Sequence, residues 1–97
     1  MPIEVADNSA ESRFEILVDG KVAGFADYRL MPTKIVFTHT EVLPEMEGQG
    51  LAGKLVKHAL DAGRDAGLRV VPLCPYVASY IERHPAYKDL VDESVGG

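Results

Sequence analysis

A strand pattern, a glycine-rich turn and a helix pattern follow one another between residues 34 and 67, and this succession constrains the fold most. Lys34–Val42 (KIVFTHTEV) is rich in β-branched residues, which is typical of a strand. After the turn, apolar residues recur at helical spacing until Gly67, a residue suited to end a helix. Residues 68–74 (LRVVPLC) read as the next strand. The helix is then a right-handed crossover, and the two strands that it joins should be parallel.

The segment before this unit predicts a β-hairpin. Residues 12–18 alternate between apolar and polar side chains, the pattern of a half-buried strand. Asp19-Gly20 suits a two-residue turn with positive φ, and Lys21–Leu30 would be the returning strand. Gly24 inside that strand permits a bulge or a close backbone approach. With the strand that follows, the hairpin forms an antiparallel meander.

Further expectations concern the faces and ends of these elements. Simple alternation puts His39 on the same face as Phe37. Pro72 has no N–H, so its strand should lie at an edge or splay from its neighbour. Pro75 suits the first position of a short helix, which His84-Pro85 would end. Residues 86–91 would form a last turn, and the termini, residues 1–10 and 92–97, are expected to fray.

These elements predict an α/β fold with a mixed sheet: an antiparallel meander, then strand, helix, parallel strand and helix, with the third and fourth strands splayed. The 97 residues fit one domain, 1–97, whose core spans about residues 12–91. A net charge of −5 argues against nucleic-acid binding, and no apolar run reaches the roughly 20 residues of a membrane span. The N-terminus lacks a signal-peptide pattern, and Cys74 has no partner for a disulfide, so we expect a cytoplasmic protein.

The turn at residues 48–53 (GQGLAG) is the segment with a chemical signature. Glycines let a backbone approach a ligand closely, and the N–H groups at a helix start bind anions such as phosphate. The spacing is not that of a P-loop, and the antiparallel strands before it do not suit a dinucleotide fold. From the residues alone, an anion site and a simple tight turn both remain open. The three histidines have no metal-ligand spacing, so no metal is expected.

Three segments of the chain resemble the GNAT acetyltransferase superfamily, and in particular its small subgroup of roughly hundred-residue proteins. They are HTEV (residues 39–42), EGQGLAGKL (47–55) and VPLCPYVASYIERHP (71–85). The resemblance covers about residues 14–91. The superfamily signature is Gln/Arg-x-x-Gly-x-Gly/Ala; Gly50 and Ala52 match its last two positions, but Glu47 stands where Gln or Arg is usual.

The resemblance implies acetyl-CoA as the cosubstrate. The turn would hold the pyrophosphate, and the strand ending at Glu41-Val42 would pair with the pantetheine amides in a gap between the splayed strands. Lys57, on the exposed side of the helix, could meet a CoA phosphate or simply be solvated. The residues expected to bind the cofactor are Val42, Gly48, Gln49, Gly50, Leu51, Ala52, Gly53 and Lys54.

Four side chains are candidates for the chemistry. Cys74 precedes a helix start and could accept the acetyl group, or it could be a small buried residue. Tyr80 matches the position where the superfamily commonly protonates the leaving thiolate, with Tyr76 as a weaker competitor. His39 could take the proton of the incoming amine, and Glu41 could do so through a water molecule.

The leading hypothesis is therefore acetyl transfer from acetyl-CoA to an amine, by direct attack or through acetylated Cys74. The alternatives are a non-catalytic CoA or acyl-CoA-binding module and a structural interaction domain. Only Asp19-Gly20 stands where the superfamily usually carries helices over the acceptor site. The acceptor groove should thus be open, which suits a protein or peptide amine. The oligomeric expectation is a monomer or a weak homodimer.

Overall fold

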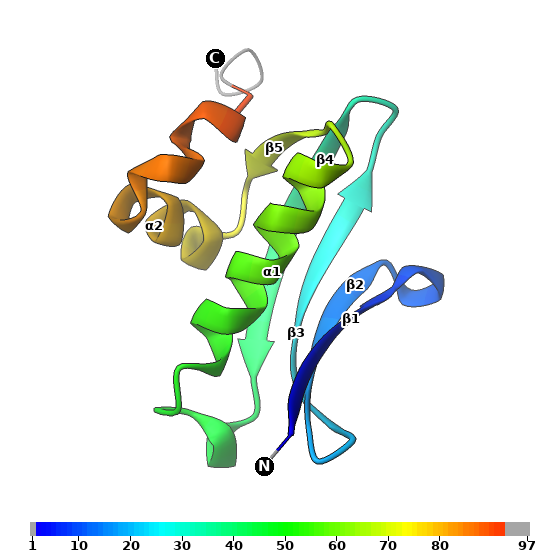
Figure 1. Ribbon diagram of the computed structural model, residues 1–97, viewed down its shortest axis with the longest axis vertical. Coiled ribbons are helices and arrows are strands. Elements are labelled where there is room, and N and C mark those ends of the chain that lie inside the picture. Colours follow the sequence, from blue (N-terminus) through cyan, green and yellow to red (C-terminus); the bar gives the residue numbers. More distant parts are fainter. Residues whose placement is uncertain (1, 93–97) are drawn as a thin grey trace.

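The computed structural model describes residues 2–92 as a five-stranded sheet with both α-helices packed on the same face (Figure 1). The strand order in the sheet is β1-β2-β3-β4-β5. The first four strands are antiparallel neighbours, whereas β5 runs parallel to β4 because α1 carries the chain back along the sheet. The elements are β1 (Ile3–Asn8), β2 (Arg13–Val18), β3 (Lys21–Leu30), β4 (Lys34–Val42), α1 (Leu51–Asp65), β5 (Arg69–Pro72) and α2 (Pro75–Arg83). The predicted mixed α/β fold is confirmed, with one additional strand.

The additional strand is β1, in a segment where the sequence predicts no regular element. It pairs with β2 along its whole length, and a 3₁₀ helix (Ser9–Glu11) joins the two. The expectation that residues 1–10 fray is therefore wrong for residues 3–8. β1 lies at the edge of the sheet, and Val5 packs against the core. An edge strand of this kind needs little apolar sequence, which is why the pattern is weak.

The β2–β3 hairpin has the predicted turn. Asp19 and Gly20 have φ values of 52° and 79°, as a two-residue turn of the type I′ class requires. The register of the pair shifts beside Gly24. A Cβ atom at Gly24 would lie 2.7 Å from the carbonyl oxygen of Glu41, so the predicted close backbone approach is confirmed.

A β-bulge at Thr38 changes which side chains of β4 share a face. Tyr28 pairs with Phe37, but the preceding residue Asp27 pairs with His39, so Thr38 is the extra residue. Because Tyr28 and Asp27 point to opposite faces of β3, Phe37 and His39 point to opposite faces as well. The prediction that His39 shares a face with Phe37 is therefore wrong. Phe37 is buried in the core, whereas the His39 side chain is 57% exposed.

The two faces of the sheet consequently differ. We call the face covered by the helices the inner face and the opposite one the outer face. The core lies between the inner face and the apolar stripe of α1, as the helical spacing predicts. The buried residues of α1 are Leu51, Leu55, Val56, Ala59, Leu60 and Gly63.

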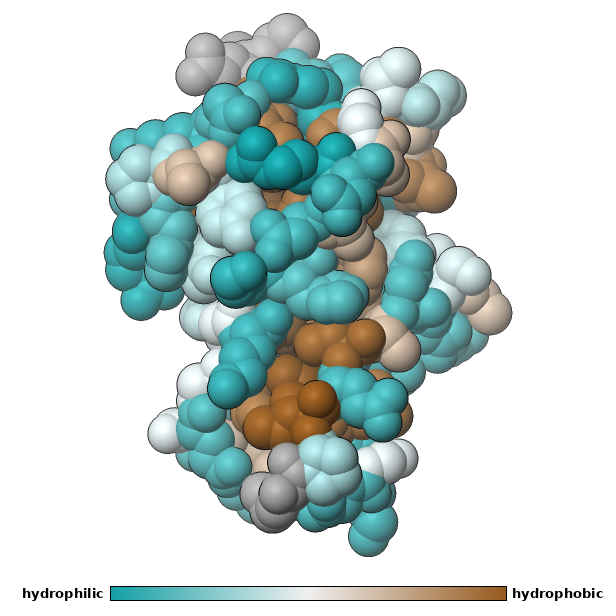
Figure 2. Space-filling view, in the orientation of Figure 1, coloured by the Kyte–Doolittle hydropathy of each residue, from teal (hydrophilic) through white to brown (hydrophobic). Residues whose placement is uncertain are grey.

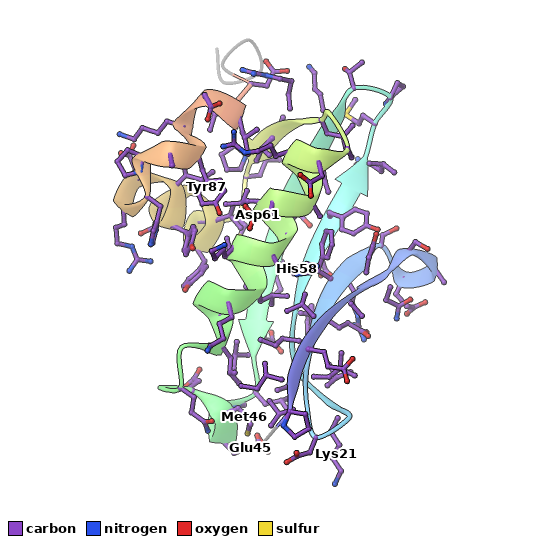
Figure 3. The ribbon with its side chains drawn as sticks, viewed as in Figure 1. Lys21, Glu45, Met46, His58, Asp61 and Tyr87 are labelled. Atoms are coloured by element: carbon purple, nitrogen blue, oxygen red, sulfur yellow. The ribbon has the colours of Figure 1, made fainter. Side chains whose placement is uncertain are left out.

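The C-terminal segment forms hydrogen bonds with α1 and with the sheet. A 3₁₀ helix (Pro85–Leu90) follows α2, and its Tyr87 hydroxyl donates a 2.7 Å hydrogen bond to Oδ1 of Asp61 on α1 (Figure 3). The N–H of Asp92 donates to the carbonyl of Val70, and its carboxylate lies 3.1 Å from Nζ of Lys34. Fraying was expected from residue 92 onward; this is wrong for Asp92, and residues 93–97 lie outside the described residues. Within residues 2–92, no helix has the length and apolar character needed to cross a membrane.

Candidate active site

Strand β5 pairs with only the first part of β4. The parallel register runs from Lys34 with Arg69 to Phe37 with Pro72, and the N–H of Cys74 adds one bond to the carbonyl of Phe37. Pro72 has no N–H to continue the ladder, and the chain then turns away into α2 (Figure 1). β4 continues to Val42 without β5 beside it. The predicted splay is confirmed, and it leaves backbone groups of β4 facing a gap.

The start of α1 faces the same end of β4. Gly50 is the N-cap residue, with φ of +73°, and no side chain caps the helix. The first turn of α1 contains no acidic residue. The N–H groups at the start of a helix have no partner within the helix, and together with the helix dipole they attract an anion.

A cavity of about 440 Å³ lies between these two features. It is lined by Thr40, Glu41, Val42, Met46, Glu47, Gly48, Gly50, Leu51, Ala52, Gly53 and Tyr76. Of the residues predicted to bind the cofactor, Gln49 and Lys54 are the ones outside this lining. Met46 belongs to a 3₁₀ helix (Pro44–Met46) in the loop that follows β4. The end of β4, the turn and the start of α2 thus enclose one space.

A second hollow, of about 330 Å³, adjoins the cavity between α1 and α2. It shares Gly50, Gly53 and Tyr76 with the cavity, and the cationic side chains that line it are Lys54, Lys57 and Arg83. Lys54 is exposed and has no ion-pair partner among residues 2–92, whereas Lys57 lies 3.0 Å from Oδ2 of Asp61. The hydrogen bond and charge of Asp61 raise the pKa of Lys57, which therefore stays cationic.

A third hollow lies on the other side of Met46, and its lining is more apolar than that of the cavity. It has a volume of about 440 Å³ and is lined by Val18, Ala23, Leu43 and Met46 among others. Figure 2 shows brown apolar surface in the lower half of this face, beside the place where Figure 3 labels Lys21, Glu45 and Met46. Gln49 lines this hollow rather than the cavity.

Cys74 is the N-cap residue of α2 and is only 3% exposed. Its thiol donates a 3.4 Å hydrogen bond to Oγ1 of Thr40, and Thr40 lines the cavity. Cys74 itself is not part of the lining. The thiol thus lies behind the wall of the cavity, where β4 and β5 part.

The two tyrosines of α2 lie differently. Tyr80 is 6% exposed and lines the second hollow, with its ring stacked on His84 at 4.0 Å between ring centres. Burial raises the pKa of Tyr80, so its phenol stays protonated at neutral pH. Tyr76 lines both the cavity and the second hollow. A Cβ atom at Gly53 would lie 3.9 Å from the Tyr76 hydroxyl and 3.9 Å from the Tyr80 ring, so both tyrosines face the first turn of α1.

The two candidate bases lie together on the outer face of β4. Nε2 of His39 is 3.2 Å from Oε1 of Glu41, and the ring of Phe25 is 6.1 Å from the His39 ring. Glu41 lines the cavity, but His39 does not. The structure therefore brings these two residues together, at a different face from Cys74 and Thr40.

Sequence reasoning missed Thr40 and Met46 as cavity residues, and it named Tyr76 only as a weaker competitor of Tyr80. The Thr38 bulge turns Thr40 to the inner face, and no feature of the sequence marks that bulge. Met46 lies in the cavity because the loop after β4 winds into a 3₁₀ helix. Among residues 2–92, no group of His, Cys, Asp and Glu side chains is arranged to hold a metal ion.

Comparison with known families identifies the class of protein. Residues 13–90 match the sequence model of the family described as GCN5-related N-acetyl-transferase. Since this match takes in most of the chain, the protein belongs to the GCN5-related N-acetyltransferase (GNAT) family and is an acetyltransferase. No curated protein sequence matches the chain significantly.

Two solved structures have a similar fold. One is the solution structure of a GCN5-like putative N-acetyltransferase from Staphylococcus aureus, 25% identical, with a TM-score of 0.69 over 92% of this chain and 87% of that one. The other is a ribosomal-protein-alanine N-acetyltransferase from Brucella melitensis biovar Abortus, 20% identical, with a TM-score of 0.60. That match covers 82% of this chain and 60% of the Brucella chain.

Proposed function

We propose that the protein transfers an acetyl group from acetyl-CoA to an amine, and that acetyl-CoA binds in the cavity between β4 and the start of α1. The observation that carries this proposal is the uncapped helix start at Gly50, which faces backbone left free by the parting of β4 and β5. The N–H groups that follow Gly50 would receive the pyrophosphate, because they lack partners within the helix.

The pantetheine arm would lie as an added strand along the edge of β4 on the β5 side. The backbone of β4 from Thr38 to Val42 has no strand on the β5 side, so it can pair with the pantetheine amides. The thioester would then reach the point where the two strands part, beside Thr40 and Cys74. The second hollow would receive the remaining phosphate charge of CoA, because Lys54, Lys57 and Arg83 line its wall.

In the direct reaction, a neutral amine nitrogen attacks the thioester carbon, and the carbon–sulfur bond breaks. The proton of the amine passes to the His39–Glu41 pair, and the CoA thiolate leaves and takes a proton. Tyr80 is the predicted donor of that proton, and its raised pKa supports a protonated phenol. Tyr76 is the alternative, since it lines the cavity that would hold the thioester. Phenylalanine substitution at each position separates the two, because a general acid contributes about 10²–10⁴-fold to rate.

Cys74 offers a second route, in which its sulfur accepts the acetyl group and CoA leaves before the amine arrives. The burial of Cys74 and its thiol hydrogen bond to Thr40 favour direct attack, with Cys74 as part of the wall. Mass analysis of the protein after incubation with acetyl-CoA alone decides between the routes, since only the second leaves an acetyl group on Cys74.

The acceptor would approach from the outer face, which no helix of residues 2–92 covers. Both connections before β3 are short, the 3₁₀ helix at Ser9–Glu11 and the Asp19-Gly20 turn. This open approach supports a protein or peptide amine as the acceptor. The test is incubation with labelled acetyl-CoA and a panel of amines, followed by mass analysis of the amines.

A further inference from the structure

The outer face beside the strand split carries a compact group of four side chains. The register pairs Asp27 with His39 and Phe25 with Glu41, so all four project from the same face of β3 and β4. His39 and Glu41 are within 3.2 Å of each other, and Phe25 lies against His39. We call these four residues the outer-face patch. It lies next to Phe37, the last residue of β4 that pairs with β5.

Asp27 is the charged member of the patch without a function in the reaction described above. Its carboxylate forms no ion pair or side-chain hydrogen bond with any of residues 2–92, and its half-buried side chain keeps its oxygens in contact with solvent. The cationic residue Arg13 lies directly opposite Asp27 on the neighbouring strand β2. A carboxylate left without a partner beside a cation requires an explanation.

Arg13 is engaged elsewhere. Its Nε donates a 2.8 Å hydrogen bond to Oε2 of Glu15, and its guanidinium carbon lies 4.8 Å from the centre of the Phe25 ring. Glu15 also accepts a hydrogen bond from Nδ2 of Asn8. Arg13 and Glu15 therefore satisfy each other, and Asp27 keeps an unneutralised negative charge beside the candidate base pair.

We infer that the acceptor is an aliphatic amine carrying a second positive charge, which Asp27 binds while the reactive amine lies at His39 and Glu41. This inference rests on the proposed function and names its substrate class. Diagonal neighbours on adjacent strands, such as Asp27 and Glu41, are about 7–8 Å apart, a span that the methylene chain of a diamine can bridge. The ring of Phe25 provides an apolar surface between the two carboxylates for that chain.

The charges of the two amines then differ during the reaction. The reactive nitrogen loses its proton to the His39–Glu41 pair and forms the new bond to the acetyl carbon, as CoA leaves with a proton of its own. The second amine remains an ammonium throughout, so its pairing with Asp27 persists from substrate to product. Asp27 therefore determines specificity and takes no part in proton transfer.

Two acceptors of equal length test the assignment. With saturating acetyl-CoA, we expect kcat/KM for 1,5-diaminopentane to exceed that for pentylamine by about tenfold, equal to about 1.4 kcal/mol. Asp27→Asn should remove this preference, and the thermal unfolding of the variant without ligand checks that it is folded. Asp27→Ser should behave like Asp27→Asn. Glu4→Gln is the matched control, because Glu4 is an exposed carboxylate on β1, away from the patch, and it should keep the preference.

The source of the second charge is resolved with peptides. A peptide in which lysine is followed by a second lysine is compared with one in which it is followed by alanine. A preference for the dilysine peptide over the free diamine indicates a basic polypeptide acceptor, and the reverse indicates a small diamine; both support the assignment. The assignment would be overturned by equal rates for the diamine and pentylamine together with equal rates for the two peptides. It would also be overturned by a preference that survives Asp27→Asn.

A binding readout distinguishes this failure from failure of the proposed function. In the presence of CoA, 1,5-diaminopentane should shift the backbone amide signals of the outer-face patch, and Asp27→Asn should weaken this binding about tenfold. If the diamine binds in this way but no amine is acetylated, the proposed catalysis fails and the Asp27 assignment stands. If amines are acetylated but the diamine shifts none of these signals, the proposed function stands and the Asp27 assignment fails.

Discussion

Gly50→Ala and Gly67→Ala form a matched pair that separates backbone strain from ligand binding. Both glycines have φ of +73°, and a Cβ atom at either position would have no atom within 4 Å. Gly50 lines the cavity at the start of α1, whereas Gly67 lies just beyond the other end of the helix. Each substitution forces a side chain into the left-handed region, at a cost of about 1–2 kcal/mol.

The two variants should therefore lose similar stability. In a domain of this size, about 1 kcal/mol lowers Tm by roughly 4–8 °C, so both should melt detectably below the unmodified protein and close to each other. Only Gly50→Ala adds a methyl group where a phosphate would approach the helix start. We expect its affinity for acetyl-CoA to fall by at least about tenfold, with the affinity of Gly67→Ala unchanged.

The assay is thermal unfolding of both variants without ligand, followed by calorimetric titration with acetyl-CoA well below the lower Tm. Equal affinities in the two variants, at equal stability, would refute the placement of the phosphate at Gly50. A parallel loss of affinity in both variants would show that strain, rather than contact with the ligand, decides binding.

Three further outcomes are expected. Lys54→Ala should weaken acetyl-CoA binding severalfold in calorimetry. The affinity of the unmodified protein should fall as the salt concentration rises, because exposed charges are screened beyond about 8 Å at 0.15 M. An affinity independent of salt contradicts this expectation. Cys74→Ala should keep most of the turnover in a steady-state assay. Loss of turnover in this variant, together with an acetyl group on Cys74 of the unmodified protein, would establish the covalent route. Hydrogen bonds from Asn8 and Arg13 lower the pKa of Glu15 below 4.5, so its contribution to stability is present above that pH and is lost as the pH falls through the lowered value. Urea unfolding between pH 7 and pH 3 should show this loss, and Glu15→Gln should remove it; an identical pH dependence in the variant would count against it.

Most elements follow from local sequence patterns. The boundaries of β3 and β4 match the predicted strands, and Gly67 has the positive φ expected beyond the end of α1. Pro72 predicts that its strand lies at an edge or splays from its neighbour, because the residue has no N–H, and β5 does both. These features depend on near neighbours in the chain, which the sequence displays directly.

The features that the sequence does not predict depend on pairing between distant segments. β1 is held by its hydrogen bonds to β2 and needs little apolar patterning of its own. The bulge at Thr38 appears only when the register with β3 is known, and it moves His39 to the outer face and Thr40 to the cavity. For this reason simple alternation places His39 on the wrong face.

The activity to be tested is the transfer of an acetyl group from acetyl-CoA, bound at the Gly50 turn, to an amine. The most direct measurement uses isotopically labelled acetyl-CoA with mono- and diamines, with mass analysis of the amines and assay of the CoA released. We expect labelled N-acetyl product and CoA in equal amounts, with slower formation in Gly50→Ala than in Gly67→Ala at subsaturating acetyl-CoA. Bound acetyl-CoA with no labelled amine from any acceptor would contradict it.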